Sequence, residues 1–256
     1  MKPIRTLIAI AALAGIVAPA AQAASLADIQ KDGVFRVGTE GTYPPFTYHD
    51  ESGELTGFDV AIARAIGEKL GVKVKFLEGR WDGLIAGLDA DRYDAVINEV
   101  GITDARKKKY DFSQPYIASK AALIVREGET DISSFDDLKG KTAAQTLSSN
   151  FGKIASDHGA ELIGTNGFDQ SIALVLQNRA DATVNDSLSF LDFKKHKPDA
   201  PVKLAATQPD ANYSGVIIAK EQPELLAAIN KALDEMKADG TYQKISQEYF
   251  GEDVSK

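Results

Sequence analysis

Short apolar segments alternate with helical patterns over residues 34–97. Three runs have the length of buried strands and two segments have helical spacing: 34–37, 72–76 and 95–97 for the strands, 58–70 and 81–88 for the helices. In the first helical segment Phe58, Ile62 and Ile66 recur four residues apart on one face, while Glu68 falls on the opposite, polar face. This alternation predicts a largely parallel sheet covered by helices.

The same rhythm begins again after Tyr116. Strand-like runs and helical stretches follow one another: 121–125, 142–144, 162–163 and 182–184 for the strands, a stretch from 150 and one around 172–176 for the helices. The chain then returns to helix, with Leu225, Ile229 and Leu233 at fourfold spacing and a short terminal helix after Gly240. Two similar α/β lobes are therefore predicted.

The first 23 residues have the pattern of a secretory signal peptide. Lys2 and Arg5 precede an apolar run from residue 7 to 17, and the small-residue tripeptide Ala21-Gln22-Ala23 follows. The apolar run is about half of the roughly 20 residues that a membrane-spanning helix needs. We therefore expect a mature chain that starts near Ala24, lies in the periplasm and is not inserted in a membrane.

Charge and cysteine content exclude several classes of function. The chain has a formal net charge of −8, and removal of Lys2 and Arg5 leaves about −10. The largest basic block is residues 106–109, so we expect no nucleic-acid partner. The sequence contains no cysteine, which excludes disulfides, thiolate metal sites and a catalytic thiol.

Motifs for metal binding or nucleophilic catalysis are missing from the sequence. His49, His158 and His196 lie far apart in polar sequence, without the HExxH spacing of a zinc site. There is no GxSxG motif for a serine nucleophile. We therefore expect no metal or cofactor, and we expect that the protein is not an enzyme.

Five segments, in this order and spacing, resemble the periplasmic polar amino-acid-binding proteins of ABC importers, solute-binding protein family 3. They are GTEGTYPPF (38–46), LTGFDVAIARAIGEKLGVKVKF (55–76), WDGLIAGL (81–88), VINEVGITDARKKKYDFSQPY (96–116) and SFDDLKGK (134–141). Within that family the GTYPPF, WDG and ITDARKKKYDFS motifs are most similar to the cystine-binding branch.

The resemblance implies a two-lobed periplasmic binding protein (Venus-flytrap) fold with two hinge-crossing strands. Lobe 1 would be discontinuous, made of residues 24–117 and 215–256, and lobe 2 would be residues 118–214 with the hinge strands near 118–120 and 210–214. The resemblance also implies a cleft that closes on a free amino acid and an inner-membrane ABC permease as partner. We expect the protein to act as a monomer.

Arg106 is the candidate for the ligand's carboxylate. A free amino acid presents a carboxylate and an ammonium, and both must be paired when water leaves. A planar guanidinium forms two parallel hydrogen bonds to a carboxylate, which a lysine cannot do. Thr103 is a good N-cap, so Arg106 is expected in the first turn of a helix, and the resemblance places the carboxylate contact at the same residue.

Lobe 2 is expected to supply Ser148, Ser149 and Asp186. Ser148 and Ser149 precede a helical pattern, so hydroxyl and backbone N–H groups there can meet the carboxylate, and the resemblance indicates Ser149 as the main contact. Asp186 follows an apolar strand and matches the family's ammonium-binding aspartate. The alternative for both Ser149 and Asp186 is an ordinary helix N-cap.

Four further residues are expected at the site on lobe 1. Tyr43 and Trp81 match positions that flank the ligand's side chain in relatives. Asn98 and Gly101 border the site, and Gly101 allows its backbone N–H to approach the carboxylate closely. Relatives commonly have a hydroxyl residue at the position of Gly101, so one polar contact differs here.

Glu40 and Glu99 do not decide which side chain the ligand carries. Either carboxylate can receive a cationic side chain or the second ammonium of cystine, and either can face solvent instead. L-cystine is the expected ligand, with a basic amino acid or glutamine as the alternative. From another class, a periplasmic cyclohexadienyl (prephenate or arogenate) dehydratase on the same scaffold is the rival, with Glu40 or Glu99 as general acid or base.

Overall fold

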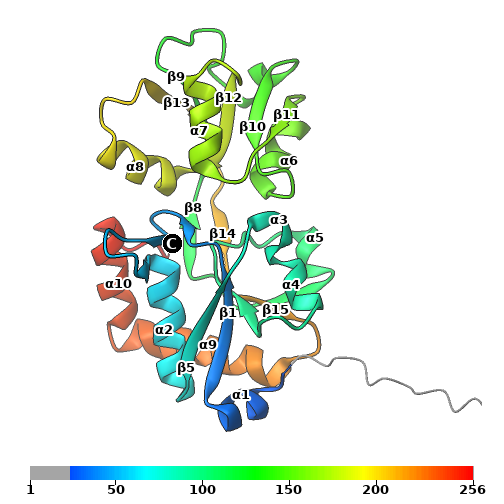
Figure 1. Cartoon of the computed structure of the whole chain (residues 1–256), viewed down its shortest axis with the longest axis vertical. Coiled ribbons are helices and arrows are strands. Elements are labelled where there is room, and N and C mark those ends of the chain that lie inside the picture. The colour runs from blue at the N-terminus through cyan, green and yellow to red at the C-terminus, as the bar shows by residue number, and fades with distance from the viewer. Residues whose placement is uncertain (1–23, 256) are drawn as a thin grey trace, which may run out of the picture.

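Two five-stranded sheets form two lobes, and both sheets have the same pattern of parallel and antiparallel neighbours (Figure 1). The computed structural model describes residues 24–255, so the expected signal peptide, residues 1–23, lies outside the described residues. The sheet of lobe 1 has the order β5 (Lys73–Glu78), β1 (Val34–Thr39), β6 (Ala95–Val96), β15 (Ile217–Ala219), β7 (Tyr110–Phe112). The sheet of lobe 2 has the order β11 (Glu161–Gly164), β10 (Thr142–Gln145), β12 (Ala182–Asp186), β9 (Ala121–Arg126), β13 (Val202–Thr207).

In each sheet the fourth strand of this order runs against its neighbours. In lobe 1, β1 pairs parallel with β5 and β6, and β15 pairs antiparallel with β6 and β7. In lobe 2, β10 pairs parallel with β11 and β12, and β9 pairs antiparallel with β12 and β13. The prediction of two similar α/β lobes with largely parallel sheets is confirmed.

Helices cover both sheets. Lobe 1 carries α1 (Leu26–Asp32) and α2 (Phe58–Leu70), together with α9 (Pro223–Ala238) and α10 (Thr241–Phe250) from the end of the chain (Figure 1). Lobe 2 carries α6 (Asn150–Asp157), α7 (Phe168–Leu176), α8 (Ser187–His196) and the 3-10 turn η1 (Phe135–Leu138). The predicted helix over 58–70 is confirmed, and Gly71 ends it in the left-handed conformation at φ 75°.

Short elements fill the connections of lobe 1. They are β2 (Thr42–Tyr43), β3 (Thr47–His49), β4 (Leu55–Thr56), α3 (Trp81–Leu84), α4 (Ala86–Asp89) and α5 (Asp104–Lys107). The segment 81–88, expected as one helix, consists of the two short helices α3 and α4. Gly83 and Gly87 lower its helix propensity, and Gly87 is packed so tightly against Tyr93 that a Cβ there would clash with that ring.

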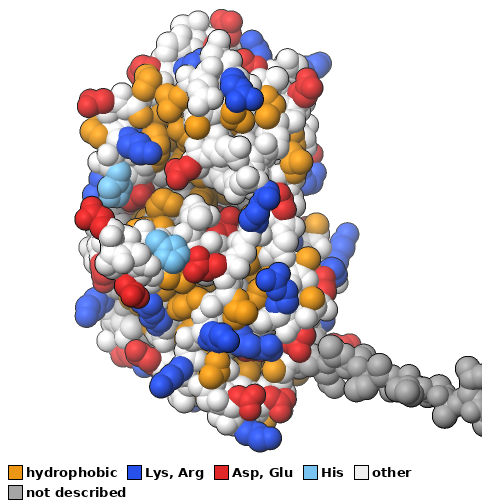
Figure 2. All heavy atoms as spheres, viewed as in Figure 1, with side chains coloured by type: hydrophobic (Ala, Val, Ile, Leu, Met, Phe, Trp, Pro, Cys, Tyr) orange, Lys and Arg blue, Asp and Glu red, His pale blue; other side chains and the backbone are white. Residues whose placement is uncertain are grey.

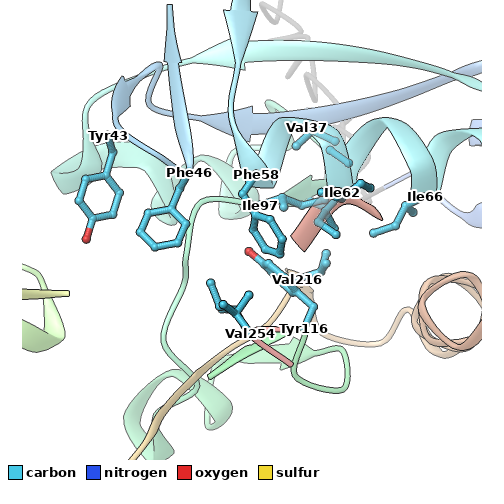
Figure 3. Close-up of a cluster of buried hydrophobic side chains, with 14 of the residues drawn as sticks. Val37, Tyr43, Phe46, Phe58, Ile62, Ile66, Ile97, Tyr116, Val216 and Val254 are labelled. Atoms are coloured by element: carbon cyan, nitrogen blue, oxygen red, sulfur yellow. The ribbon is translucent and has the colours of Figure 1, made fainter. Parts of the chain in front are cut away.

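An aromatic cluster joins α2 to the end of the chain (Figure 3). The Phe58 ring stacks on Tyr116 at 6.1 Å and meets the Phe250 ring of α10 at 5.0 Å. Ile62 and Ile66 are fully buried in the same cluster, as their spacing predicted. Each such side chain contributes about 1.5–3 kcal/mol by leaving water, which fixes α10 on lobe 1.

Two paired strands lie between the lobes. β8 (Ile117–Ser119) and β14 (Asn212–Ser214) are antiparallel, with Ser119 opposite Asn212 and Ile117 opposite Ser214. In Figure 1 they run between the lower and the upper lobe. The backbone of this hinge pair is therefore shared by both lobes. Within residues 24–255, no helix has the length and apolar character needed to cross a membrane.

Candidate ligand-binding cleft

A narrow chamber with a cavity volume of about 30 Å³ lies between the two lobes. Residues of both lobes line this inner chamber: Glu40, Thr42, Tyr43, Trp81 and Glu99 from lobe 1, and Thr146, Ser149, Asn150, Phe151, Gly167, Phe168 and Asn185 from lobe 2. Figure 2 shows a hollow at the level where the lobes meet, with apolar and acidic side chains around it. Glu40 and Glu99, the two glutamates whose orientation the sequence does not decide, both line it.

An outer groove continues from the chamber. It is lined by residues 101–106 of lobe 1 and by residues 147–150 of lobe 2, among others. Ser149 and Asn150 line both spaces, so the chamber and the groove share a wall. Arg106, Gly101 and Ser148 border the groove, whereas Tyr43, Trp81, Ser149, Glu40 and Glu99 border the chamber.

Hydrogen bonds connect the lobes across the cleft. Tyr43 Oη donates to Asn185 Oδ1 at 2.7 Å, and in Figure 3 this hydroxyl points away from the aromatic cluster. Ser148 Oγ donates to Asp82 Oδ1 at 2.7 Å. Ser189 Oγ donates to the Pro44 carbonyl at 3.1 Å. These contacts join residues far apart in the sequence, and they place the lobes in a closed arrangement.

Arg106 lies in the first turn of α5, as its spacing from Thr103 predicted. Thr103 Oγ1 accepts a hydrogen bond from the Arg106 backbone N–H at 3.2 Å, which confirms the N-cap. The guanidinium is half-buried, and its Nη1 donates to the Gly101 carbonyl at 2.9 Å and to Asn150 Oδ1 at 3.4 Å. Its centre lies 5.2 Å from the Trp81 ring centroid. Arg106 is thus held over an aromatic face and directed toward lobe 2.

Ser149 and Ser148 are placed differently. Ser149 Oγ accepts from the Gly152 N–H at 2.9 Å and donates to the Thr146 carbonyl at 2.7 Å, so it is the N-cap of α6 as well as part of the chamber wall. The Ser148 hydroxyl donates a hydrogen bond to Asp82 of lobe 1, so it joins the two lobes. Asn150, the first residue of α6, is the lobe 2 residue that meets Arg106.

Asp186 is not among the residues that line the chamber or the groove. It is fully buried at 0 % exposure, its Oδ1 accepts from the Leu188 N–H at 2.8 Å, and its Oδ2 accepts from Ser119 Oγ. It therefore caps α8, the alternative reading of the sequence. Asn185, which the sequence reasoning missed, lines the chamber at this point. Side chains alternate across a strand, so the residue beside Asp186 was the signal that could have identified it.

Asn98 holds Glu40 in the chamber wall. Asn98 is fully buried; its Nδ2 donates to Glu40 Oε2 at 2.8 Å, and its Oδ1 accepts from the Glu40 N–H at 2.7 Å. Burial raises the pKa of Glu40 to about 7, partly offset by the bond from Asn98. Gly101 lies against lobe 2, where an added Cβ would come within 3.3 Å of Asn150 Nδ2. A hydroxyl residue at 101 would crowd Asn150 in this arrangement.

Glu99 is a buried acid at the chamber floor. It is 4 % exposed, has φ 48°, and its Oε1 accepts from Ser214 Oγ at 2.8 Å. Burial and the nearby Asp186 charge raise the pKa of Glu99 well above its usual range, and Arg106 opposes that shift. Burial also raises the pKa of Asp186 to about 6. The charges of Arg106 and Asp186 thus act on Glu99 in opposite directions.

The histidines lie away from the chamber. His49 bonds Glu78, His158 bonds Asp136, and His196 lies beside Asp192. Among residues 24–255, no three His, Asp or Glu side chains are grouped as metal ligands. The chemistry that the arrangement offers is the pairing of charges on a small zwitterion.

Comparisons with known proteins agree with this geometry. The family model "Bacterial extracellular solute-binding proteins, family 3" matches residues 35–252. The L-cystine-binding protein TcyA of Bacillus subtilis is 46 % identical over 231 residues, covering 90 % of this chain and 86 % of that protein. Among solved structures, an ancestral arginine-binding protein bound to arginine has a TM-score of 0.81 at 41 % identity, covering 85 % of this chain and 98 % of its own.

A third comparison bears on the lobe arrangement. The L-cystine solute receptor of Neisseria gonorrhoeae, in its unliganded open conformation, is 45 % identical and covers 91 % of this chain and 100 % of its own, yet its TM-score is 0.62. Higher identity with lower overlap fits a different angle between two similar lobes. The arginine-bound neighbour overlaps better, in agreement with the hydrogen bonds across the cleft described above.

Proposed function

Because the chain belongs to family 3 of the bacterial extracellular solute-binding proteins, we propose that it captures L-cystine in the interlobe cleft, which consists of the inner chamber and the outer groove, and delivers it to an inner-membrane ABC permease. The observation that carries the proposal is a cleft joined across the lobes by hydrogen bonds, with Tyr43, Glu40 and Glu99 in its wall and the Arg106 guanidinium held over Trp81 beside it. The relative TcyA is named an L-cystine-binding protein, which supports this ligand and capture without catalysis. The protein works in the periplasm as a monomer.

The carboxylate site consists of Arg106, Ser149 and Asn150. Arg106 supplies paired N–H donors, and the first turn of α6 supplies backbone N–H groups from lobe 2. The ammonium site consists of Glu99 and Asp186. The carboxylate and the ammonium of an α-amino acid are attached to the same carbon, so their binding sites must be neighbours. The electrostatic effect of Arg106 on Glu99 supports that proximity.

The remaining chamber residues contact the ligand's side chain. Tyr43 and Trp81 provide aromatic walls, and Asn98 positions the Glu40 carboxyl and Gly101 the Arg106 guanidinium. Glu40 receives the second ammonium of cystine. The same position would suit the side chain of a basic amino acid, which is the alternative ligand.

A thermal-shift panel tests the proposal. A ligand that binds only the native state raises its stability, by about 2.7 kcal/mol when present at 100 times its Kd. We expect L-cystine to raise the melting temperature most among cystine, arginine, lysine, histidine and glutamine. A larger shift with a basic amino acid would replace cystine by that ligand, and no shift with any amino acid would refute the function.

A further inference from the structure

Asn185 is a buried amide in the wall of the inner chamber, and two hydrogen bonds fix its orientation. It is the last residue but one of β12, the central strand of the lobe 2 sheet, and it is 8 % exposed. Its Oδ1 accepts from Tyr43 Oη at 2.7 Å and from the Asp186 backbone N–H at 2.8 Å. Among residues 24–255, no acceptor is bonded to the other amide atom, Nδ2.

The two bonds at Oδ1 settle which way the amide faces. A backbone N–H can only donate, so the amide atom that faces the Asp186 nitrogen must be the oxygen. The amide nitrogen is then directed away from both donors, and the space that Asn185 lines is the inner chamber. An amide N–H that loses water without gaining an acceptor costs free energy. The closed cleft therefore favours a ligand that brings an acceptor to Asn185 Nδ2.

Glu40 of lobe 1 lines the same chamber with the opposite hydrogen-bonding character. Its carboxyl accepts from Asn98 Nδ2 at 2.8 Å and has further acceptor sites for a ligand. The chamber thus offers an acceptor from lobe 1 and a donor from lobe 2. The far end of cystine, meaning the half that does not meet Arg106, carries an ammonium and a carboxylate, which match this pair. The far end of arginine or lysine carries donors only.

We propose that Asn185 is a specificity-determining residue: its Nδ2 donates to the carboxylate at the far end of a two-headed amino acid and disfavours ligands whose far end carries donors only. This inference rests on the proposed function and names the basis on which cystine is selected over a basic amino acid. Arginine or lysine would leave Nδ2 unpaired and place a cation beside it. A site built to hydrogen-bond a ligand group rejects analogues without that group strongly, because its own polar group stays unpaired.

Calorimetric titration with two matched ligands tests the inference. L-Cystine is compared with the mixed disulfide of L-cysteine and cysteamine, which keeps the near amino-acid head, the disulfide and the far ammonium but lacks the far carboxylate. The titrations are run at about pH 8, where a carboxyl is ionised, on the wild type, Asn185→Ala and Asn185→Asp. Asn185→Asp retains an oxygen for the Tyr43 and Asp186 donors and replaces the NH₂ donor by an acceptor. Asn178→Asp, at an exposed position after α7, adds the same charge to lobe 2 as a control.

For the wild type we expect L-cystine to bind about tenfold or more tightly than the cysteamine disulfide, and this ratio should fall toward one in Asn185→Ala. In Asn185→Asp the order should reverse, because the new oxygen repels the carboxylate, while Asn178→Asp keeps the wild-type ratio. An unchanged ratio in a folded Asn185 variant overturns the inference. If neither variant folds, equal affinity of the wild type for the two disulfides overturns it. Failure of the wild type to bind L-cystine refutes the proposed function instead.

Discussion

The carboxylate site and the ammonium site are built in different ways. Arg106 is half-buried at the mouth of the chamber and is prepared by local structure, since Thr103 caps its helix and Ser149 caps α6. Glu99 and Asp186 are fully enclosed and are held by serines of the hinge strands. Each half of the first site is formed within a short segment of its own lobe, whereas the second site is held by the strands between the lobes, and lobe closure completes both. The comparison indicates that the two charges shared by all amino acids are met by groups that the fold holds in different ways.

The largest loss of ligand affinity is expected when the carboxylate site loses its paired hydrogen-bond donors. Arg106→Lys keeps the charge but not the planar geometry over Trp81, so we expect binding to weaken by about 2–5 kcal/mol. Calorimetric titration measures the change, and Lys107→Ala, an exposed neighbour, is the control. Wild-type affinity in a folded Arg106→Lys protein would remove Arg106 from the site.

A somewhat smaller loss of ligand affinity is expected from a substitution at the ammonium site. Asp186→Asn retains a good N-cap for α8 but removes the charge, so we expect about 1.5–3 kcal/mol weaker binding of the amino acid with little change in melting temperature. Parallel binding and unfolding measurements separate the two effects. Equal losses in binding and stability would make Asp186 a structural cap only.

Closure itself is tested by Tyr43→Phe. The substitution removes the 2.7 Å hydrogen bond to Asn185 and keeps the aromatic wall, so we expect affinity to fall by about 0.5–1.5 kcal/mol. The loss should lie in the dissociation rate, because the bond exists only between closed lobes. Stopped-flow displacement of bound ligand measures that rate, and an unchanged rate would contradict the role of this contact.

The smallest effect is expected from Glu40. Its carboxyl has a pKa of about 7 when buried in the unliganded chamber, so the acid is increasingly ionised above neutral pH. A ligand cation facing Glu40 should therefore bind a few-fold more tightly at about pH 8 than at about pH 6, as expected for partial linkage to one proton. In Glu40→Gln, the affinity for L-cystine should depend less on pH across this range. An unchanged profile would place the second ammonium elsewhere.

The contrast between the two sites also explains what the sequence could predict. The helix at 58–70 and the N-cap of Arg106 follow from periodicity and from capping chemistry over three residues. The two-lobed fold follows from the alternation of strands and helices. These features depend on neighbours in the chain, so the printed sequence is sufficient to find them.

The rest depends on contacts between distant residues. Tyr43 and Asn185 are 142 positions apart, and Ser214 reaches Glu99 across 115 positions. Periodicity carries no information on such pairings, so the sequence could name Glu99 without deciding whether it faces the cleft. The same limit applies to Asn98, which was expected to border the site and whose two hydrogen bonds to Glu40 no local pattern indicated.

One measurement tests the central claim most directly: calorimetric titration of the mature protein with L-cystine, carried out on the wild type and on Arg106→Lys. The account predicts saturable binding of one cystine per chain, weakened about 30-fold or more in Arg106→Lys, which corresponds to a loss of at least about 2 kcal/mol. Equal affinity in the two folded proteins, or no binding of any amino acid to the wild type, would contradict it.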